Sequence, residues 1–181
     1  RDRVATVMHG PATRESAGRA LDELGETERV LATAGMTGTL GDAEWRVLWP
    51  RAASAAFDEG NDASVVMEIA GPDVPRTILL GDLSASAQTA LLGTERVAGP
   101  YPVVKVAHHG SADQAPQLYA ELAPAVALVT VGPANAYGHP RAALPTPPAS
   151  LRAPPPPTPH SGLLPLPPAD REPVAWRDPP P

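Results

Sequence analysis

Residues Val103 to Ser111, with the sequence VVKVAHHGS, form a short apolar, β-branched run that ends in two histidines, a glycine and a serine. A continuous apolar run is typical of a strand buried on both faces of a sheet, and the loops that leave such strands often carry functional residues. His108 and His109 stand at the expected strand exit and project in different directions. One imidazole can therefore ligate a metal while the other faces a substrate, and Gly110 lets the backbone turn or approach a ligand closely.

A second strand with a polar end lies upstream, in the sequence RTILLGDLS. Thr77 to Leu80 form another apolar run, which stops at Gly81 and Asp82. The following residues, Leu83 to Leu92, predict a short helix with Ser84 as its N-cap. The order strand, Asp, helix, strand, His-His brings a carboxylate and an imidazole to the same edge of a sheet. Zinc and manganese both accept this mixture of oxygen and nitrogen ligands.

The composition limits the kinds of protein this chain can be. With 181 residues, 43% of them hydrophobic, one domain with an aliphatic core is expected. The absence of cysteine excludes disulfides and thiolate metal sites. A formal net charge of −6 argues against a broad electrostatic grip on nucleic acid. No run approaches the roughly 20 apolar residues of a membrane span, so no independent membrane insertion is expected.

The remaining patterns predict a mixed α/β fold. An apolar stripe with helical spacing predicts an amphipathic helix over residues 14–24. The stretch GPDVP reads as a turn that joins two strands in an antiparallel hairpin, and the alternation after His109 indicates a parallel βαβ unit. Further elements are expected as strands at Val4–Met8, Glu28–Ala32, Glu44–Trp49, Ser64–Ala70 and Ala125–Val131, and as a helix at Gln117–Leu122.

Three motifs together resemble a known family. GDLSASAQTALL, VVKVAHHGSADQ and VGPANAYGHP are similar to the metallo-β-lactamase-type domain at the C-terminal end of ComEC, the membrane channel for DNA uptake in competence. The resemblance runs from about Gly41 to Pro140 and includes the motifs LWP and GNDASVV. It implies a partial metallo-β-lactamase αββα sandwich over residues 1–140. It also implies that Asp82 bridges two divalent metals, zinc or manganese. His109 is then the expected ligand and His108 the expected phosphate contact, although the two roles could be reversed.

The function implied by this resemblance is metal-assisted hydrolysis of DNA, in which the domain degrades the strand that is not imported. The membrane channel of the same parent protein is then a partner, and the extracytoplasmic face of the cell membrane is the expected location, with this segment itself soluble. Members of the superfamily usually carry an HxHxDH cluster ahead of these strands, and the chain contains none. Two alternatives stay open: a soluble hydrolase of the same fold acting on a small phosphoester or other ester, and an inactive fragment without catalysis.

Other polar residues were weighed as site candidates. His9 follows the strand Val4–Met8 and is better explained as a surface or capping histidine than as a ligand. Asn61, Asp62 and Ser64 are better explained as turn residues whose side chains bond local backbone than as site-lining residues. His139, between Gly and Pro, is more typical of an ordinary loop than of a substrate contact.

The composition changes beyond residue 140. Most of the 25 prolines lie in residues 141–181, where too few backbone donors remain for a helix or a sheet. This segment is therefore expected to be a disordered, polyproline-like tail. A shifted reading frame near Arg141 would account for the change, and an intact frame together with detection of the protein by mass spectrometry would rule it out.

Overall fold

A computed structural model describes residues 5–11, 25, 27–51, 57, 60–131 and 138 of the chain. The predicted helix over 14–24, the loop that contains His139 and the Pro-rich tail lie outside these residues. Within the described part, no helix has the length and apolar character that a membrane-spanning helix needs.

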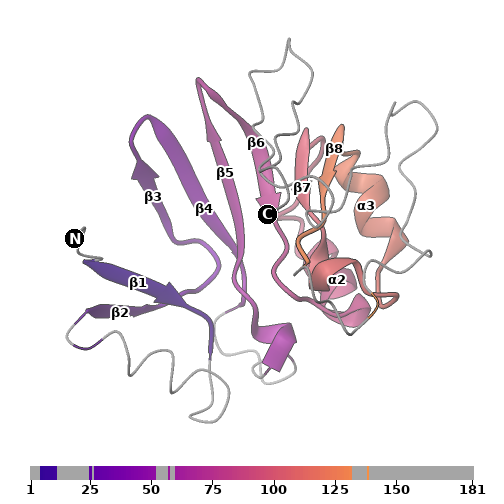
Figure 1. The fold of residues 1–181 in the computed structure, drawn as a ribbon, viewed down its shortest axis with the longest axis horizontal. Helices are drawn as coiled ribbons and strands as arrows, with labels where there is room; N and C mark the ends of the chain where they lie inside the picture. The colour runs from indigo at the N-terminus through magenta and orange to yellow at the C-terminus, as the bar shows by residue number, and fades with distance from the viewer. Residues whose placement is uncertain are drawn as a thin grey trace, which may run out of the picture.

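The fold is a mixed α/β arrangement, which confirms the predicted class. Two helices lie beside one end of a six-stranded sheet, and a separate pair of parallel strands lies beyond the other end (Figure 1). The parallel pair is β1 (Thr6–His9) and β2 (Glu28–Leu31). The large sheet has the order β3 (Thr37–Leu40), β4 (Ala43–Trp49), β5 (Val66–Gly71), β6 (Val74–Leu79), β7 (Val103–Lys105) and β8 (Val126–Leu128).

The first four strands of the large sheet are antiparallel. The β5–β6 hairpin confirms the turn predicted at GPDVP, and β4 confirms the strand predicted to precede Pro50. The end of β4 differs from simple alternation, because Val47, Leu48 and Trp49 are all buried. The pairing of β4 with β5 shifts its register between Val47 and Trp49, as it does at a β-bulge.

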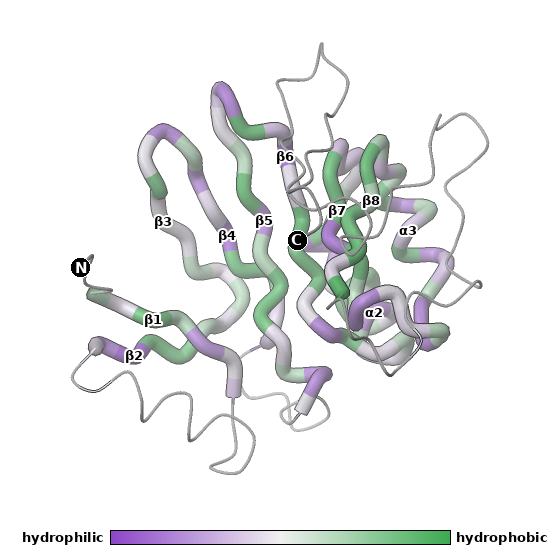
Figure 2. The backbone as a smooth tube through the Cα atoms, viewed as in Figure 1, coloured by the Kyte–Doolittle hydropathy of each residue, from purple (hydrophilic) through white to green (hydrophobic). Residues whose placement is uncertain are grey.

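The other half of the sheet is parallel. Helix α2 (Ala85–Leu92) connects β6 to β7, and α3 (Pro116–Leu122) connects β7 to β8. Ser84 caps α2 as predicted, accepting a hydrogen bond from the backbone N–H of Ala87. Hydrophobic residues run along β7 and β8 (Figure 2). Among the described residues the core between sheet and helices is mostly aliphatic, and its large, fully buried aromatic side chains are Trp49 and Tyr101.

A polar cluster joins the antiparallel half to the parallel half. Glu68 on β5 accepts hydrogen bonds from Arg76 on β6 and from the hydroxyl of Tyr101, which precedes β7. Burial raises the pKa of Glu68, but the hydrogen bonds from Tyr101, Arg76 and Arg46 outweigh it and lower the net pKa. Burial, helped by Glu68, raises the pKa of Tyr101 to about 12. The cluster therefore keeps Glu68 ionised and Tyr101 protonated, and it fixes β6 between its neighbours.

Candidate metal-binding site

The position of Asp82 is fixed by hydrogen bonds that the backbone of its loop makes with side chains before β5. Gly81 follows β6 with a φ of +58°, a left-handed conformation that favours glycine. The backbone N–H of Asp82 donates to Ser64 Oγ at 3.0 Å, and the N–H of Ser84 donates to Asp62 Oδ1 at 3.0 Å. The loop between β6 and α2 is thus fastened to the segment before β5.

This arrangement refines the interpretation of the GNDAS motif. The predicted turn is confirmed as a 3₁₀ turn, η1 (Gly60–Ala63), with a local backbone bond from Ser64 N–H to the Asn61 carbonyl. The side chains of Asp62 and Ser64, however, do not stay local, since they bond to backbone about 20 residues further along the chain. They position Asp82, a role that neither of the two sequence interpretations included.

The two histidines occupy a tight turn, η2 (Ala107–Gly110), directly after β7. His108, His109 and Gly110 have φ values of 45°, 54° and 74°. Left-handed backbone at non-glycine residues is costly and persists only where the surroundings fix it. The two imidazole rings form an edge-on pair, with centroids 6.4 Å apart and planes at 68°. The N–H of His108 donates to the Gly81 carbonyl at 3.0 Å, which joins this turn to the Asp82 loop.

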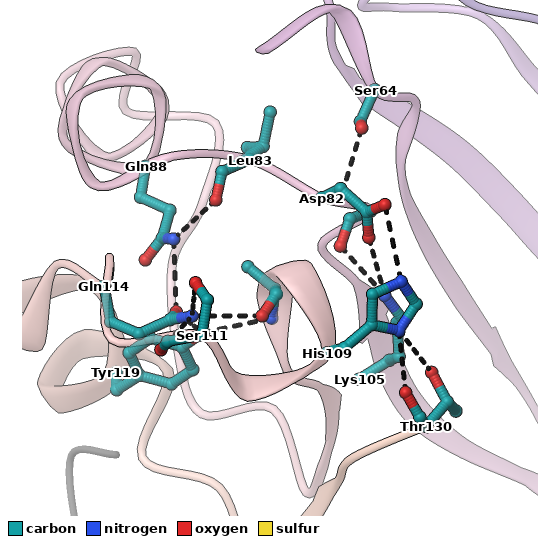
Figure 3. Close-up of polar contacts among 12 residues, drawn as sticks. Ser64, Asp82, Leu83, Gln88, Lys105, His109, Ser111, Gln114, Tyr119 and Thr130 are labelled. Carbon is teal, nitrogen blue, oxygen red and sulfur yellow. Dashed lines mark hydrogen bonds and ion pairs between the residues drawn. The ribbon is translucent and has the colours of Figure 1, made fainter. Parts of the chain in front are cut away.

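A buried hydrogen-bond network lies beneath the histidine turn (Figure 3). Gln114 Nε2 donates to the Ala107 carbonyl at 3.0 Å, and the Ala107 N–H donates to the Tyr119 hydroxyl at 3.2 Å. The Tyr119 hydroxyl donates to Gln114 Oε1 at 2.6 Å, and burial raises the pKa of Tyr119 well above its usual range. Gln88 of α2 is fully buried and donates to Gln114 Oε1 at 3.2 Å. The turn is thus fixed by side chains from both helices.

Replacing Gln88 with Leu is expected to destabilise the protein by about 1–3 kcal/mol, because buried polar partners lose their hydrogen bonds. Gln88 Nε2 donates to the Leu83 carbonyl at 2.8 Å, and Gln88 Oε1 accepts from the Ala115 N–H at 2.9 Å. Urea unfolding measures the change. Gln117→Leu is the matched control, since Gln117 is exposed on α3 and its replacement should change stability by less than about 0.5 kcal/mol. Equal losses in the two variants would contradict the proposed role of the network.

Asp82 and His109 face each other across the sheet edge, as their positions after neighbouring parallel strands predict. His109 Nε2 lies 3.6 Å from Asp82 Oδ2, longer than a hydrogen bond (Figure 3). His109 Nδ1 lies 2.7 Å from the carbonyl oxygen of Thr130, after β8. A carbonyl only accepts, so Nδ1 carries a hydrogen. Nε2 then faces the carboxylate with a lone pair in the neutral ring, or with a second N–H, as one half of an ion pair, in the protonated ring.

This pair of atoms has the spacing of two ligands of one metal. At Zn–N and Zn–O distances of 2.0–2.2 Å, two ligands of a tetrahedral ion lie about 3.4 Å apart. A metal-bound histidine commonly donates its other ring N–H to a carbonyl, as His109 does to Thr130. Among the described residues, no group of three or more His, Cys, Asp or Glu side chains could hold a metal. The spacing of Asp82 Oδ2 and His109 Nε2 is therefore compatible with two ligands of one metal, which would need further ligands.

Two contacts of this site escaped the sequence analysis. Lys105, the last residue of β7, donates to the Gly81 carbonyl at 2.9 Å and lies 3.5 Å from Asp82 Oδ1. In VVKV it reads only as a polar interruption of a strand, but it is the single lysine among the 14 basic residues of the chain. The Thr130 carbonyl is a backbone group, and no sequence signal marks it.

The other histidine candidates have different surroundings. His9 ends β1, in the smaller sheet, and its Nδ1 lies 2.7 Å from the carbonyl oxygen of Gly10. This contact fits the expected surface or capping role. His139 lies outside the described residues.

Comparison of the chain with protein-family models, with curated proteins and with solved structures gave no match.

Proposed function

We propose that this chain carries part of the metal centre of a metallo-β-lactamase-type phosphoester hydrolase, with Asp82 and His109 as metal ligands and His108 as the substrate contact. The observation that carries the proposal is the 3.6 Å approach of His109 Nε2 to Asp82 Oδ2, with Nδ1 held by a carbonyl. A lone pair and a carboxylate oxygen repel each other, so the approach needs either a metal ion between the two atoms or a proton on Nε2. The choice of His109 over His108 as the ligand rests on the same contact.

The fold supports this proposal at a coarser level. One portion of a metallo-β-lactamase sandwich contains a mixed sheet with helices against its parallel strands, and the sheet here carries α2 and α3 on its parallel half. The residues that follow β6 and β7 also meet at one edge of the sheet. Catalytic zinc sites usually have three protein ligands. A third would have to come from outside the described residues. The proposed centre is therefore one contribution to a larger site.

The proposed chemistry divides among three side chains. A divalent metal, when bound, activates water and stabilises negative charge that develops on a phosphoryl oxygen. Asp82 and His109 would hold that metal, and the Thr130 carbonyl keeps a hydrogen on His109 Nδ1. His108, which follows the same strand as His109, donates a ring N–H to a phosphoryl oxygen and stabilises the charge that builds there.

The proposed substrate is DNA. The proposed location is the extracytoplasmic face of the membrane, beside a channel for DNA uptake. Both proposals are based on the motif resemblance. A net charge of −6 favours a second candidate, a hydrolase of a small phosphoester or other ester, since DNA binding normally relies on clustered basic residues. The small number of ligands among the described residues favours a third, an inactive fragment.

Hydrolysis assays distinguish these candidates. The chain, and the longest open reading frame that contains it, are assayed with Zn²⁺ or Mn²⁺ on single-stranded DNA, bis(p-nitrophenyl) phosphate and p-nitrophenyl acetate. Cleavage of the two phosphodiesters but not of the acetate supports the proposal. His108→Gln should lower turnover by about 100-fold while metal binding is unchanged, because the residue contacts substrate and not metal. Activity that survives EDTA, or full activity in His108→Gln, contradicts the proposal.

A further inference from the structure

We propose that Asp82 binds one metal only, and that the ammonium group of Lys105 takes the place of the second cation. This inference rests on the proposed function and changes one of its expectations. The resemblance implies that Asp82 bridges two metals, so that two cations would share the charge of its carboxylate. In this chain the two oxygens have different partners.

The contacts of Asp82 divide by atom. Oδ2 lies 3.6 Å from His109 Nε2, on the side where a metal fits. Oδ1 lies 3.5 Å from Lys105 Nζ. The same Nζ donates to the carbonyl of Gly81 at 2.9 Å, so its position is fixed by the backbone as well as by the carboxylate (Figure 3). The ammonium group therefore lies on the Oδ1 side of the carboxylate, and a metal held together with His109 would lie on the Oδ2 side.

Burial makes this ion pair difficult to separate. The Lys105 side chain is only 18% exposed, while those of Asp82 and His109 are 35% and 43% exposed. A mostly buried ammonium group needs a compensating charge. Asp82 supplies it. Moving a metal ion against Oδ1 would separate Lys105 from this charge and place two cations side by side.

The choice of residue at position 105 points the same way. The chain has 14 basic residues, of which 13 are arginine and Lys105 alone is lysine. Arginine presents a wide, planar fork of donors, whereas lysine presents a compact point charge. A compact ammonium group can occupy a position that would otherwise bind a metal ion. Lys105 also lies on β7, between β6 and β8, where the backbone of a regular strand sets its direction.

The number of metal ions per chain tests this inference. The full 181-residue chain and the longest open reading frame that contains it are dialysed against increasing Zn²⁺, and bound zinc is measured by mass spectrometry, with zinc retained by Asp82→Asn subtracted as background. One zinc ion per chain is expected. Two would overturn the inference and leave the proposed function standing. No bound zinc in either protein would overturn the proposed function and this inference with it.

Replacing Lys105 tests the role of its charge. In Lys105→Met the aliphatic stem is kept and the charge is lost, so Zn²⁺ should bind about tenfold more tightly, because a like charge a few ångströms away is removed. In Lys105→Arg the charge is kept, and affinity should stay within about threefold of the original. A purely structural role predicts weaker binding in Lys105→Met, the opposite sign. Unchanged or weaker binding in that variant, with a native circular-dichroism spectrum, overturns the inference.

Discussion

His109→Gln is expected to lower the affinity of the chain for Zn²⁺ by at least about 100-fold, since loss of an outer-shell partner of a metal alone costs 10–100-fold. The variant removes Nε2, one of the two atoms that face each other at 3.6 Å. It leaves the ion pair between Asp82 and Lys105 in place, so the fold should survive. Isothermal titration calorimetry gives the affinity, and long-range ¹H–¹⁵N spectra of the histidine rings show which nitrogen responds to metal.

Two other histidines provide the controls for this prediction. His9→Gln changes a histidine that also follows a strand, but in the smaller sheet, and should leave Zn²⁺ affinity unchanged. His108→Gln should also leave it unchanged. If His108→Gln abolishes binding and His109→Gln does not, the two histidines have exchanged roles, which was the alternative that the sequence left open.

Sequence patterns were sufficient for the elements that bring the site together. Ile78 and Leu79 in β6 and Val103 and Val104 in β7 form short apolar runs typical of buried strands, so both strands could be predicted. Each strand is followed within a few residues by a polar side chain, Asp82 or His109, that apolar packing does not explain. The βαβ connection then places these ends at one edge. The sequence alone therefore predicts that Asp82 and His109 lie close together. The same reasoning could not assign the two imidazoles, because that depends on the carbonyl of Thr130.

The parts that sequence could not predict are polar contacts between distant segments. Gln88 sits in a short helix where a glutamine is usually exposed, yet it is fully buried beneath the histidine turn. Ser64 and Asp62 read as turn formers, yet they hold the loop around Asp82. Local propensity predicts neither contact, since each depends on how the β5 and β6 segments pack against α2 and the histidine turn. These contacts fix the positions of the Asp82 loop and the histidine turn relative to each other.

Gly81, the residue before Asp82, affects both the position of the carboxylate and the free energy of unfolding. Gly81 has a φ of +58°, and a Cβ at this position would lie 2.5 Å from Ser64 Cβ and 2.9 Å from Ser64 Oγ. Gly81→Ala is expected to cost about 2–5 kcal/mol, of which about 1–2 comes from the left-handed backbone and about 1–3 from the overlap. Ser64 must move, and its bond with the Asp82 N–H is lost.

Gly41→Ala separates the two causes. Gly41 has a φ of +60° in the turn between β3 and β4, and a Cβ there meets nothing within 4 Å, so this variant should lose only the backbone part, about 1–2 kcal/mol. Urea unfolding of both variants gives the difference, and zinc titration shows whether the carboxylate has moved. Gly81→Ala should weaken Zn²⁺ binding by about tenfold or more, as outer-shell losses do, and Gly41→Ala should not change it. Equal destabilisation of the two variants with unchanged zinc affinity would mean that Ser64 does not position Asp82, and the carboxylate would then be held mainly by Lys105.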